Sequence, residues 1–151
     1  MENQMLPDDF KEFLRLLNGH KVEYLLIGGY AVGYHGYPRT TADIDIWVAI
    51  NPETAEKLVS AFHDFGMRSP EITKELFTAP GNIVRMGMAP VRIEVLNEID
   101  GVQFDECFSS GTEVEIDGIP IKLISLADLR KNKLASGRHK DLDDLEHLPV
   151  L

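Results

Sequence analysis

IGGYAVGYHGYPRTTADIDIWV, residues 27–48, is the stretch of sequence that decides the fold. It reads as the end of a buried strand, a Gly28-Gly29 turn into a short helix, and a second strand that carries two aspartates. Successive side chains of a strand point to opposite faces, so Asp43, Asp45 and Trp47 share one face. The other face is apolar and is expected to lie in the core, through Ile44, Ile46 and Val48.

The two carboxylates on one strand indicate a candidate cation site. Asp43 and Asp45 repel each other on a shared face, and a divalent cation with hard oxygen ligands would offset that repulsion. The structural alternative is a solvated strand edge, which is the commoner explanation for an isolated D-x-D pair. Trp47 has two readings as well, because it can border a bound base or pack in the core.

The composition is that of an ordinary soluble protein, with 151 residues, 44% hydrophobic and 26% charged. This length favours a single domain over residues 1–151. One cysteine, no leader and no long apolar run lead us to expect a cytoplasmic location and no membrane span. The formal net charge of −10 disfavours broad DNA binding, which needs clustered Lys and Arg.

Periodicity and turn residues predict alternating helices and strands in the rest of the chain, which indicates an α/β (α+β) fold class. Asn51-Pro52 predicts a helix start, and Asp117-Gly118 predicts a hairpin turn. The predicted helices cover 8–17, 30–35, 52–65, 71–77, 104–108, 126–136 and 138–148. The other predicted strands cover 22–27, 83–88, 91–96, 112–116 and 119–123.

Glu94 is the candidate third acid, because it lies on the alternating strand 91–96. Its structural alternative is an ion pair with Arg92 or Lys122 across strands. A basic cluster near the C-terminus is either a solvated helix face or a contact for phosphates. This cluster consists of Lys131, Lys133, Arg138 and Lys140.

These motifs together resemble the DNA polymerase beta-like nucleotidyltransferase superfamily, through Gly28-Gly29, Asp43-Ile44-Asp45 and Glu94. The resemblance covers roughly residues 20–148 and implies a nucleotidyltransferase fold, with a short mixed sheet flanked by helices. More narrowly, the chain is similar to the small prokaryotic group that includes minimal and AbiEii-type proteins. The motifs of that group are Gly28-Gly29-Tyr30-Ala31, His35-Gly36, Arg39-Thr40, Asp43-Ile44-Asp45-Ile46 and a K-D-x-x-D-L pattern at 140–145. Many superfamily members have Gly-Ser where this chain has Gly28-Gly29, a difference that we interpret as a mark of the subgroup.

The resemblance implies an enzyme that transfers a nucleoside monophosphate from a nucleoside triphosphate to a hydroxyl and releases pyrophosphate. Its metal ligands and catalytic residues would be Asp43, Asp45 and Glu94, with Mg²⁺ or Mn²⁺ bound and Glu94 as general base. Its nucleotide-binding residues would be Gly28, Gly29, Arg39 and Lys140. Arg39 has the alternative of pairing with Asp43, and His35 is expected to pack or cap. Asp141 and Asp144 are expected to orient Lys140 or to cap helix turns.

Two other hypotheses fit the same sequence. One is an antitoxin-like or regulatory module that binds a partner protein or a second copy of itself, with weak or no catalysis. The other is a nucleotide or metal binder without transfer. The acceptor of the enzyme would be a small molecule, a protein or an RNA end.

Overall fold

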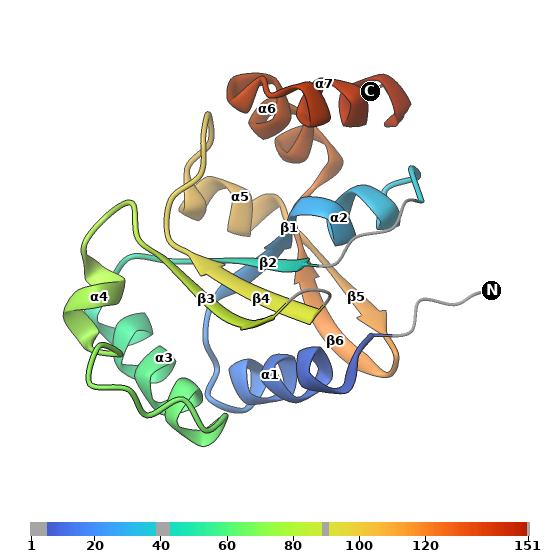
Figure 1. Ribbon diagram of the computed structural model, residues 1–151. Helices are drawn as coiled ribbons and strands as arrows, with labels where there is room; N and C mark the ends of the chain where they lie inside the picture. The colour runs from blue at the N-terminus through green and yellow to red at the C-terminus, as the bar shows by residue number, and fades with distance from the viewer. Residues whose placement is uncertain (1–5, 39–42, 89–90, 151) are drawn as a thin grey trace.

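The computed structural model describes residues 6–38, 43–88 and 91–150, and within these ranges six strands form one sheet (Figure 1). The strand order is β3-β4-β2-β1-β6-β5. The strands are β1 (Tyr24–Ile27), β2 (Asp43–Val48), β3 (Ile83–Met88), β4 (Val91–Leu96), β5 (Thr112–Ile116) and β6 (Ile119–Leu123). β2 runs parallel to β4 and antiparallel to β1, and β1 runs parallel to β6. The predicted mixed sheet is therefore confirmed.

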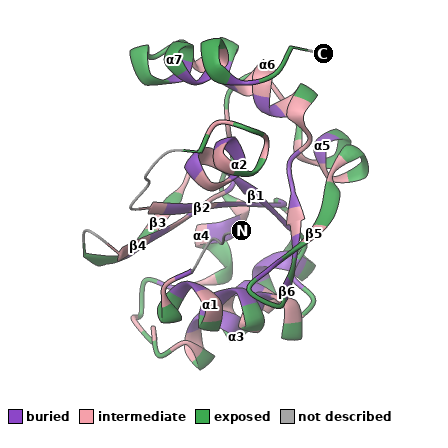
Figure 2. Ribbon diagram, turned by 90° about the vertical axis from the view of Figure 1, so that its right-hand side faces the viewer, coloured by how far each residue is buried: buried purple, intermediate pink, exposed green. Residues whose placement is uncertain are grey.

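Helices cover both faces of the sheet (Figures 1 and 2). They are α1 (Asp8–Gly19), α2 (Gly28–Tyr34), α3 (Pro52–Asp64), α4 (Lys74–Thr78), α5 (Phe104–Ser110), α6 (Leu126–Ser136) and α7 (His139–His147). α1 and α3 lie on one face, α2 and α5 lie on the other, and α6 and α7 pack together beyond α2. No helix in the described ranges is long and apolar enough to cross a bilayer.

Local signals in the sequence account for several helix ends. Asn51 Oδ1 accepts a hydrogen bond from the backbone N–H of Thr54 at 2.8 Å, and Pro52 fills the first helical position of α3. α2 begins at Gly28, two residues earlier than predicted, because Gly28 adopts a left-handed φ of +69° that turns the chain directly from β1 into the helix.

The core lies between the sheet and its helices, and the buried residues concentrate along the central strands (Figure 2). The apolar face of β2 is fully buried as predicted, with Ile44, Ile46 and Val48 at 0% exposure. Burying each such side chain contributes about 1.5–3 kcal/mol. Trp47 is also buried and packs edge-on against Phe104, with ring centroids 5.2 Å apart. Trp47 is thus a core residue beneath α5.

Candidate active site

One row of paired residues crosses four strands of the sheet and carries the acidic site. Ile27 of β1 pairs with Asp45 of β2, Asp45 pairs with Glu94 of β4, and Glu94 pairs with Arg85 of β3. Residues paired in this way lie side by side on the same face. The strand pairing therefore places two of the predicted acids together, although 49 positions in the sequence separate them. Asp43 lies two residues along β2, on the same face.

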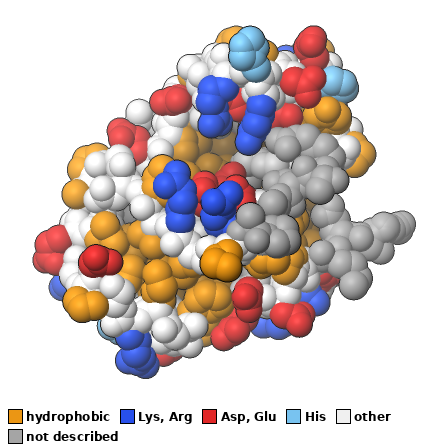
Figure 3. Space-filling view, viewed as in Figure 1, with side chains coloured by type: hydrophobic (Ala, Val, Ile, Leu, Met, Phe, Trp, Pro, Cys, Tyr) orange, Lys and Arg blue, Asp and Glu red, His pale blue; other side chains and the backbone are white. Residues whose placement is uncertain are grey.

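This face of the sheet forms the floor of a cleft of about 430 Å³, a volume typical of small-molecule sites. The space-filling view shows a hollow between basic side chains above it and a mixed group of basic and acidic side chains below it (Figure 3). Six of the seven predicted site residues line the cleft: Gly28, Gly29, Asp43, Asp45, Glu94 and Lys140. The seventh, Arg39, lies outside the described residues.

Both the backbone conformation and the space around it require glycine at position 28. Its φ of +69° lies in the left-handed region that residues with a Cβ rarely adopt, and a Cβ at Gly28 would overlap the Asp45 carboxylate. The close approach of the β1–α2 turn to Asp45 therefore requires glycine at this position. The same approach leaves the backbone of the turn open toward the cleft.

We expect Gly28→Ala to destabilise the protein by about 1–3 kcal/mol and to weaken nucleotide binding, because the new Cβ strains the backbone and pushes Asp45 aside. Urea unfolding and calorimetric titration with a nucleotide measure the two effects. Gly33→Ala in the same helix is the matched control, since open space surrounds Gly33 and alanine favours a helix there. Equal effects of the two substitutions would contradict this explanation.

Asp45 is the most perturbed acid of the cleft. Its Oδ1 is buried and has no hydrogen-bond partner within the part of the chain that the structure describes. Burial raises the pKa of Asp45 to about 7, and the nearby charges of Glu94 and Asp43 add to this rise, while Lys140 opposes it. An unpaired buried carboxylate oxygen costs free energy unless a ligand or a proton satisfies it.

The other two acids are paired with arginines. Arg92 Nε donates to Asp43 Oδ1 at 3.2 Å, and Arg85 Nε donates to Glu94 Oε2 at 2.8 Å. Within the described ranges, no three acidic, histidine or cysteine side chains converge on a single point in the manner of metal ligands. Glu94 thus forms a cross-strand ion pair, which was its expected structural alternative, but its partner is Arg85 and not Arg92 or Lys122.

The C-terminal helices close the cleft and are held together by a buried ion cluster. Lys133 of α6 is 5% exposed, and its Nζ lies 3.2 Å from Asp141 Oδ1 and 3.0 Å from Asp144 Oδ2 of α7. Asp141 also accepts a 2.7 Å hydrogen bond from Arg138 Nε. Burial by itself would raise the pKa of Asp141, but the hydrogen bond from Arg138 and the charge of Lys133 hold it well below its usual range.

This cluster corrects one of the two roles expected of the aspartates. Asp141 does cap a helix turn, because it accepts a 3.2 Å hydrogen bond from the backbone N–H of Arg138 at the start of α7. The lysine between the two aspartates, however, is the buried Lys133 and not Lys140. Lys140 is exposed and lines the cleft, so its ammonium remains on the solvent side. His35 ends α2, and its Nε2 lies 2.7 Å from the carbonyl oxygen of Ile124, which agrees with the expected packing role.

Sequence reasoning missed Arg85 and three further lining residues, Asp100, Asn132 and Ser136. The sequence shows only that Arg85 lies on a short predicted strand. The pairing of β3 with β4 is what reveals that Arg85 lies beside Glu94. Asn132 donates to the carbonyl oxygen of Asp100 at 2.9 Å and ties α6 to the loop that follows β4.

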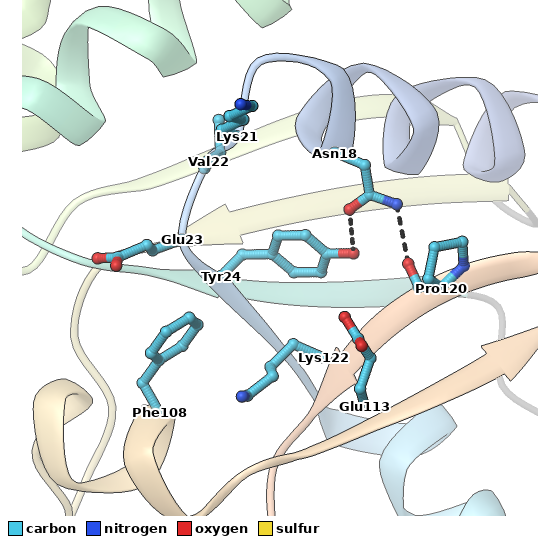
Figure 4. A pocket seen from close by; sticks show the side chains of 9 residues that line it. All are labelled: Asn18, Lys21, Val22, Glu23, Tyr24, Phe108, Glu113, Pro120 and Lys122. Carbon is cyan, nitrogen blue, oxygen red and sulfur yellow. Dashed lines mark hydrogen bonds between the residues drawn. The ribbon is translucent and has the colours of Figure 1, made fainter.

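A second cleft, of about 400 Å³, lies at the other end of β1 (Figure 4). Three of its polar groups form a chain of hydrogen bonds: the Tyr24 hydroxyl donates to Asn18 Oδ1 at 3.0 Å, and Asn18 Nδ2 donates to the carbonyl oxygen of Pro120 at 2.8 Å. The Lys122 ammonium lies 4.7 Å from the ring centroid of Phe108. This cleft contains none of the predicted site residues.

The fold is that of nucleotidyltransferases, as comparison with solved structures shows. The candidate nucleotidyltransferase TM1012 from Thermotoga maritima superposes with a TM-score of 0.61 at 17% identity, over 95% of this chain and 94% of that one. The antibiotic-resistance factor ANT(2'')-Ia superposes with a TM-score of 0.58 at 13% identity, over 91% and 79%. A second structure of ANT(2'')-Ia, in complex with adenylyl-2''-tobramycin, gives a TM-score of 0.53 at 13% identity, over 91% and 83%.

The sequence identifies the family within this class. Residues 7–150 match the family described as "Nucleotidyl transferase of unknown function (DUF2204)", and the chain belongs to that family. No curated protein sequence matches the chain significantly. Fold and family together confirm the predicted membership of the nucleotidyltransferase superfamily and the predicted enzyme class. The narrower similarity to minimal and AbiEii-type proteins stays a prediction.

Proposed function

We propose that the protein transfers a nucleoside monophosphate from a nucleoside triphosphate to a hydroxyl acceptor, with a divalent cation, Mg²⁺ or Mn²⁺, held by Asp43, Asp45 and Glu94. The observation that carries this proposal is the half-buried Asp45 carboxylate, which lies beside Glu94 of the adjacent strand and whose buried Oδ1 has no hydrogen-bond partner among the described residues. A hard oxygen donor without a partner, in a row of acids, fits a hard cation.

Each acid has a distinct part in this proposal. Asp43 and Asp45 would hold the metal that binds the triphosphate, and Glu94 would share a second metal. When bound, such cations stabilise the charge that develops at the α-phosphate and on the leaving pyrophosphate. Glu94 would accept the proton of the attacking hydroxyl. Its carboxylate is 18% exposed, so an acceptor that enters from the cleft can reach it.

The phosphates of the nucleotide would lie at the end of the acidic row next to the β1–α2 turn. Gly28 and Gly29 line the cleft and have no side chains, so their backbone N–H groups would bind the phosphates, and Lys140 of α7 would add a cation. Arg39 stays a predicted nucleotide-binding residue, and its guanidinium would neutralise charge on the leaving pyrophosphate. The antibiotic-resistance factor with the same fold has been solved with an adenylyl-2''-tobramycin, which supports ATP as the first donor to test.

The decisive experiment follows label from α-labelled ATP, GTP, CTP and UTP, each with Mg²⁺ or Mn²⁺ and cell extract as the source of acceptors. We expect the wild-type protein to label an acceptor and to release pyrophosphate. The Asp43→Asn, Asp45→Asn double variant, checked for folding by circular dichroism, is the control. If the two proteins release equal pyrophosphate and label nothing, the proposal fails and the antitoxin-like or binding-only alternatives gain support.

Nucleotide binding is expected to depend on pH through Asp45. Burial raises the pKa of Asp45 from the ordinary range of an aspartate to about 7, so in the folded protein a proton occupies the carboxylate below neutrality. The metal–nucleotide complex needs the deprotonated form, so we expect its affinity to weaken by up to about tenfold per pH unit below about pH 7. Calorimetric titration with Mg²⁺ and α,β-methylene-ATP in buffers of different ionisation enthalpy measures both the affinity and the proton released. A flat affinity from about pH 6 to pH 8 would contradict this.

A further inference from the structure

We infer that the acceptor is a small molecule with an anionic group, a phosphate or a carboxylate, near its reacting hydroxyl, and that Arg85 binds this group. The inference rests on the proposed function, because it concerns the acceptor of the same cleft. The inference specifies the charge and the size of the acceptor, which the reaction class alone does not determine.

The order of the strands gives the cleft two ends. Gly28 lies at the end of β1, Asp45 follows on β2, Glu94 on β4, and Arg85 on β3 at the edge of the sheet. The triphosphate is assigned to the Gly28 end, and the hydroxyl must reach Glu94 to lose its proton. The remainder of the acceptor therefore lies beyond Glu94, against β3.

The surface at that end combines one cation with an apolar strip. The Arg85 side chain is 59% exposed and lines the cleft, and the neighbouring pair of Ile83 and Leu96 lines it as well. Ile83 is 46% exposed although it is a large apolar residue. A short carbon skeleton would cover this strip, and an oxyanion at its end would reach the guanidinium.

Arg85 has donors to spare for such an oxyanion. Its Nε donates to Glu94, and the guanidinium carries five N–H donors in all, arranged in a fork that matches phosphate and carboxylate. A protonated amine in the same place would be repelled by Arg85. The chain's net charge of −10 opposes a long polyanion, which favours a small anionic acceptor over an RNA end.

The test uses four acceptors with one carbon skeleton: glycerol, glycerol 3-phosphate, glycerate and 3-amino-1,2-propanediol. Transfer from α-labelled ATP gives kcat/KM for each acceptor, and the ratio of anionic to neutral acceptor is the quantity compared. We expect this ratio to be about ten or more in the wild type, to fall toward one in Arg85→Gln, and to be largely kept in Arg85→Lys. The two anions distinguish a phosphate from a carboxylate. Lys140→Gln is the matched control at the opposite end, where we expect weaker ATP binding and an unchanged ratio.

A binding measurement makes the inference independent of turnover. With α,β-methylene-ATP in the nucleotide site, glycerol 3-phosphate is expected to shift the amide resonances of β3 and β4 in the wild type and in Arg85→Lys but not in Arg85→Gln. Equal binding by all three proteins, an equal loss for every acceptor in Arg85→Gln, or faster labelling of a short RNA or of the amine would overturn the inference. If wild-type protein labels no acceptor and releases no pyrophosphate while the Arg85-dependent binding persists, the proposed function fails and the anion site stands.

Discussion

Asp45→Asn is expected to make the protein more stable and inactive at the same time. At about pH 8 the Asp45 carboxylate is ionised, half-buried and next to two other acids, so a neutral amide of the same shape should raise the free energy of unfolding by about 1–3 kcal/mol. The same change removes a proposed metal ligand, and the loss of several kcal/mol of charge stabilisation lowers transfer by about a thousandfold or more.

The sign of the pH dependence follows from the raised pKa. A carboxyl whose pKa rises on folding stabilises the folded state most below its unfolded pKa, and this contribution is lost as the pH rises through about 4 toward its folded value of about 7. The advantage of Asp45→Asn over the wild type should therefore be larger at about pH 8 than at about pH 5. Urea unfolding at the two pH values measures it.

The control for Asp45→Asn is Asp105→Asn, an exposed acid in the first turn of α5. Loss of a favourable charge at a helix N-terminus should lower stability by about 0.3–1 kcal/mol and leave transfer unchanged. Mg²⁺ and α,β-methylene-ATP should raise the melting temperature of the wild type and of Asp105→Asn but not of Asp45→Asn. An Asp45→Asn protein that is less stable than the wild type at both pH values would contradict the account of the acidic row.

Lys133→Met is expected to cause the largest loss of stability, about 3–5 kcal/mol. Methionine keeps much of the volume, but it leaves Asp141 and Asp144 buried in α7 without the ammonium that lies between them. For a chain of this length the melting temperature should fall by roughly 10 °C. Since the basic residues on one side of the cleft belong to α6 and α7, the nucleotide affinity should fall together with the stability.

Two further variants identify the cause of that loss. Lys131→Met changes an exposed lysine of the same helix and should alter stability by less than about 0.5 kcal/mol. Adding Asp141→Asn and Asp144→Asn to Lys133→Met should recover much of the loss, because the buried charges are then removed together. If the triple variant is no more stable than Lys133→Met, packing and not charge explains the effect.

Local signals in the sequence predicted most of the elements. The D-x-D strand, the Asn51-Pro52 helix start and the Asp117-Gly118 turn each depend on a few adjacent residues, and each is found where it was predicted. The start of α2 was placed two residues late, because the left-handed φ of Gly28 depends on how closely the turn approaches Asp45. Periodicity carries no information about such an approach.

The candidate site shows the same division. The acids, the glycine pair and Lys140 were recognised from motifs, and all of them line one cleft. Arg85 and the buried role of Lys133 were missed. Lys133 has the same local setting as exposed Lys131, and only the packing of α7 on α6 determines which of the two lysines is buried.

The sequence by itself determined the strand faces, the turn positions and the class of chemistry, because these depend on the two-residue period of a strand and on adjacent residue types. The tertiary structure decided which residues meet. Pairing of β2 with β4 and of β4 with β3 aligned Asp45, Glu94 and Arg85 in one row. Burial then left Asp45 Oδ1 without a hydrogen-bond partner in residues 6–38, 43–88 and 91–150. Strand register between distant segments, and the desolvation that follows from it, are properties of the whole fold.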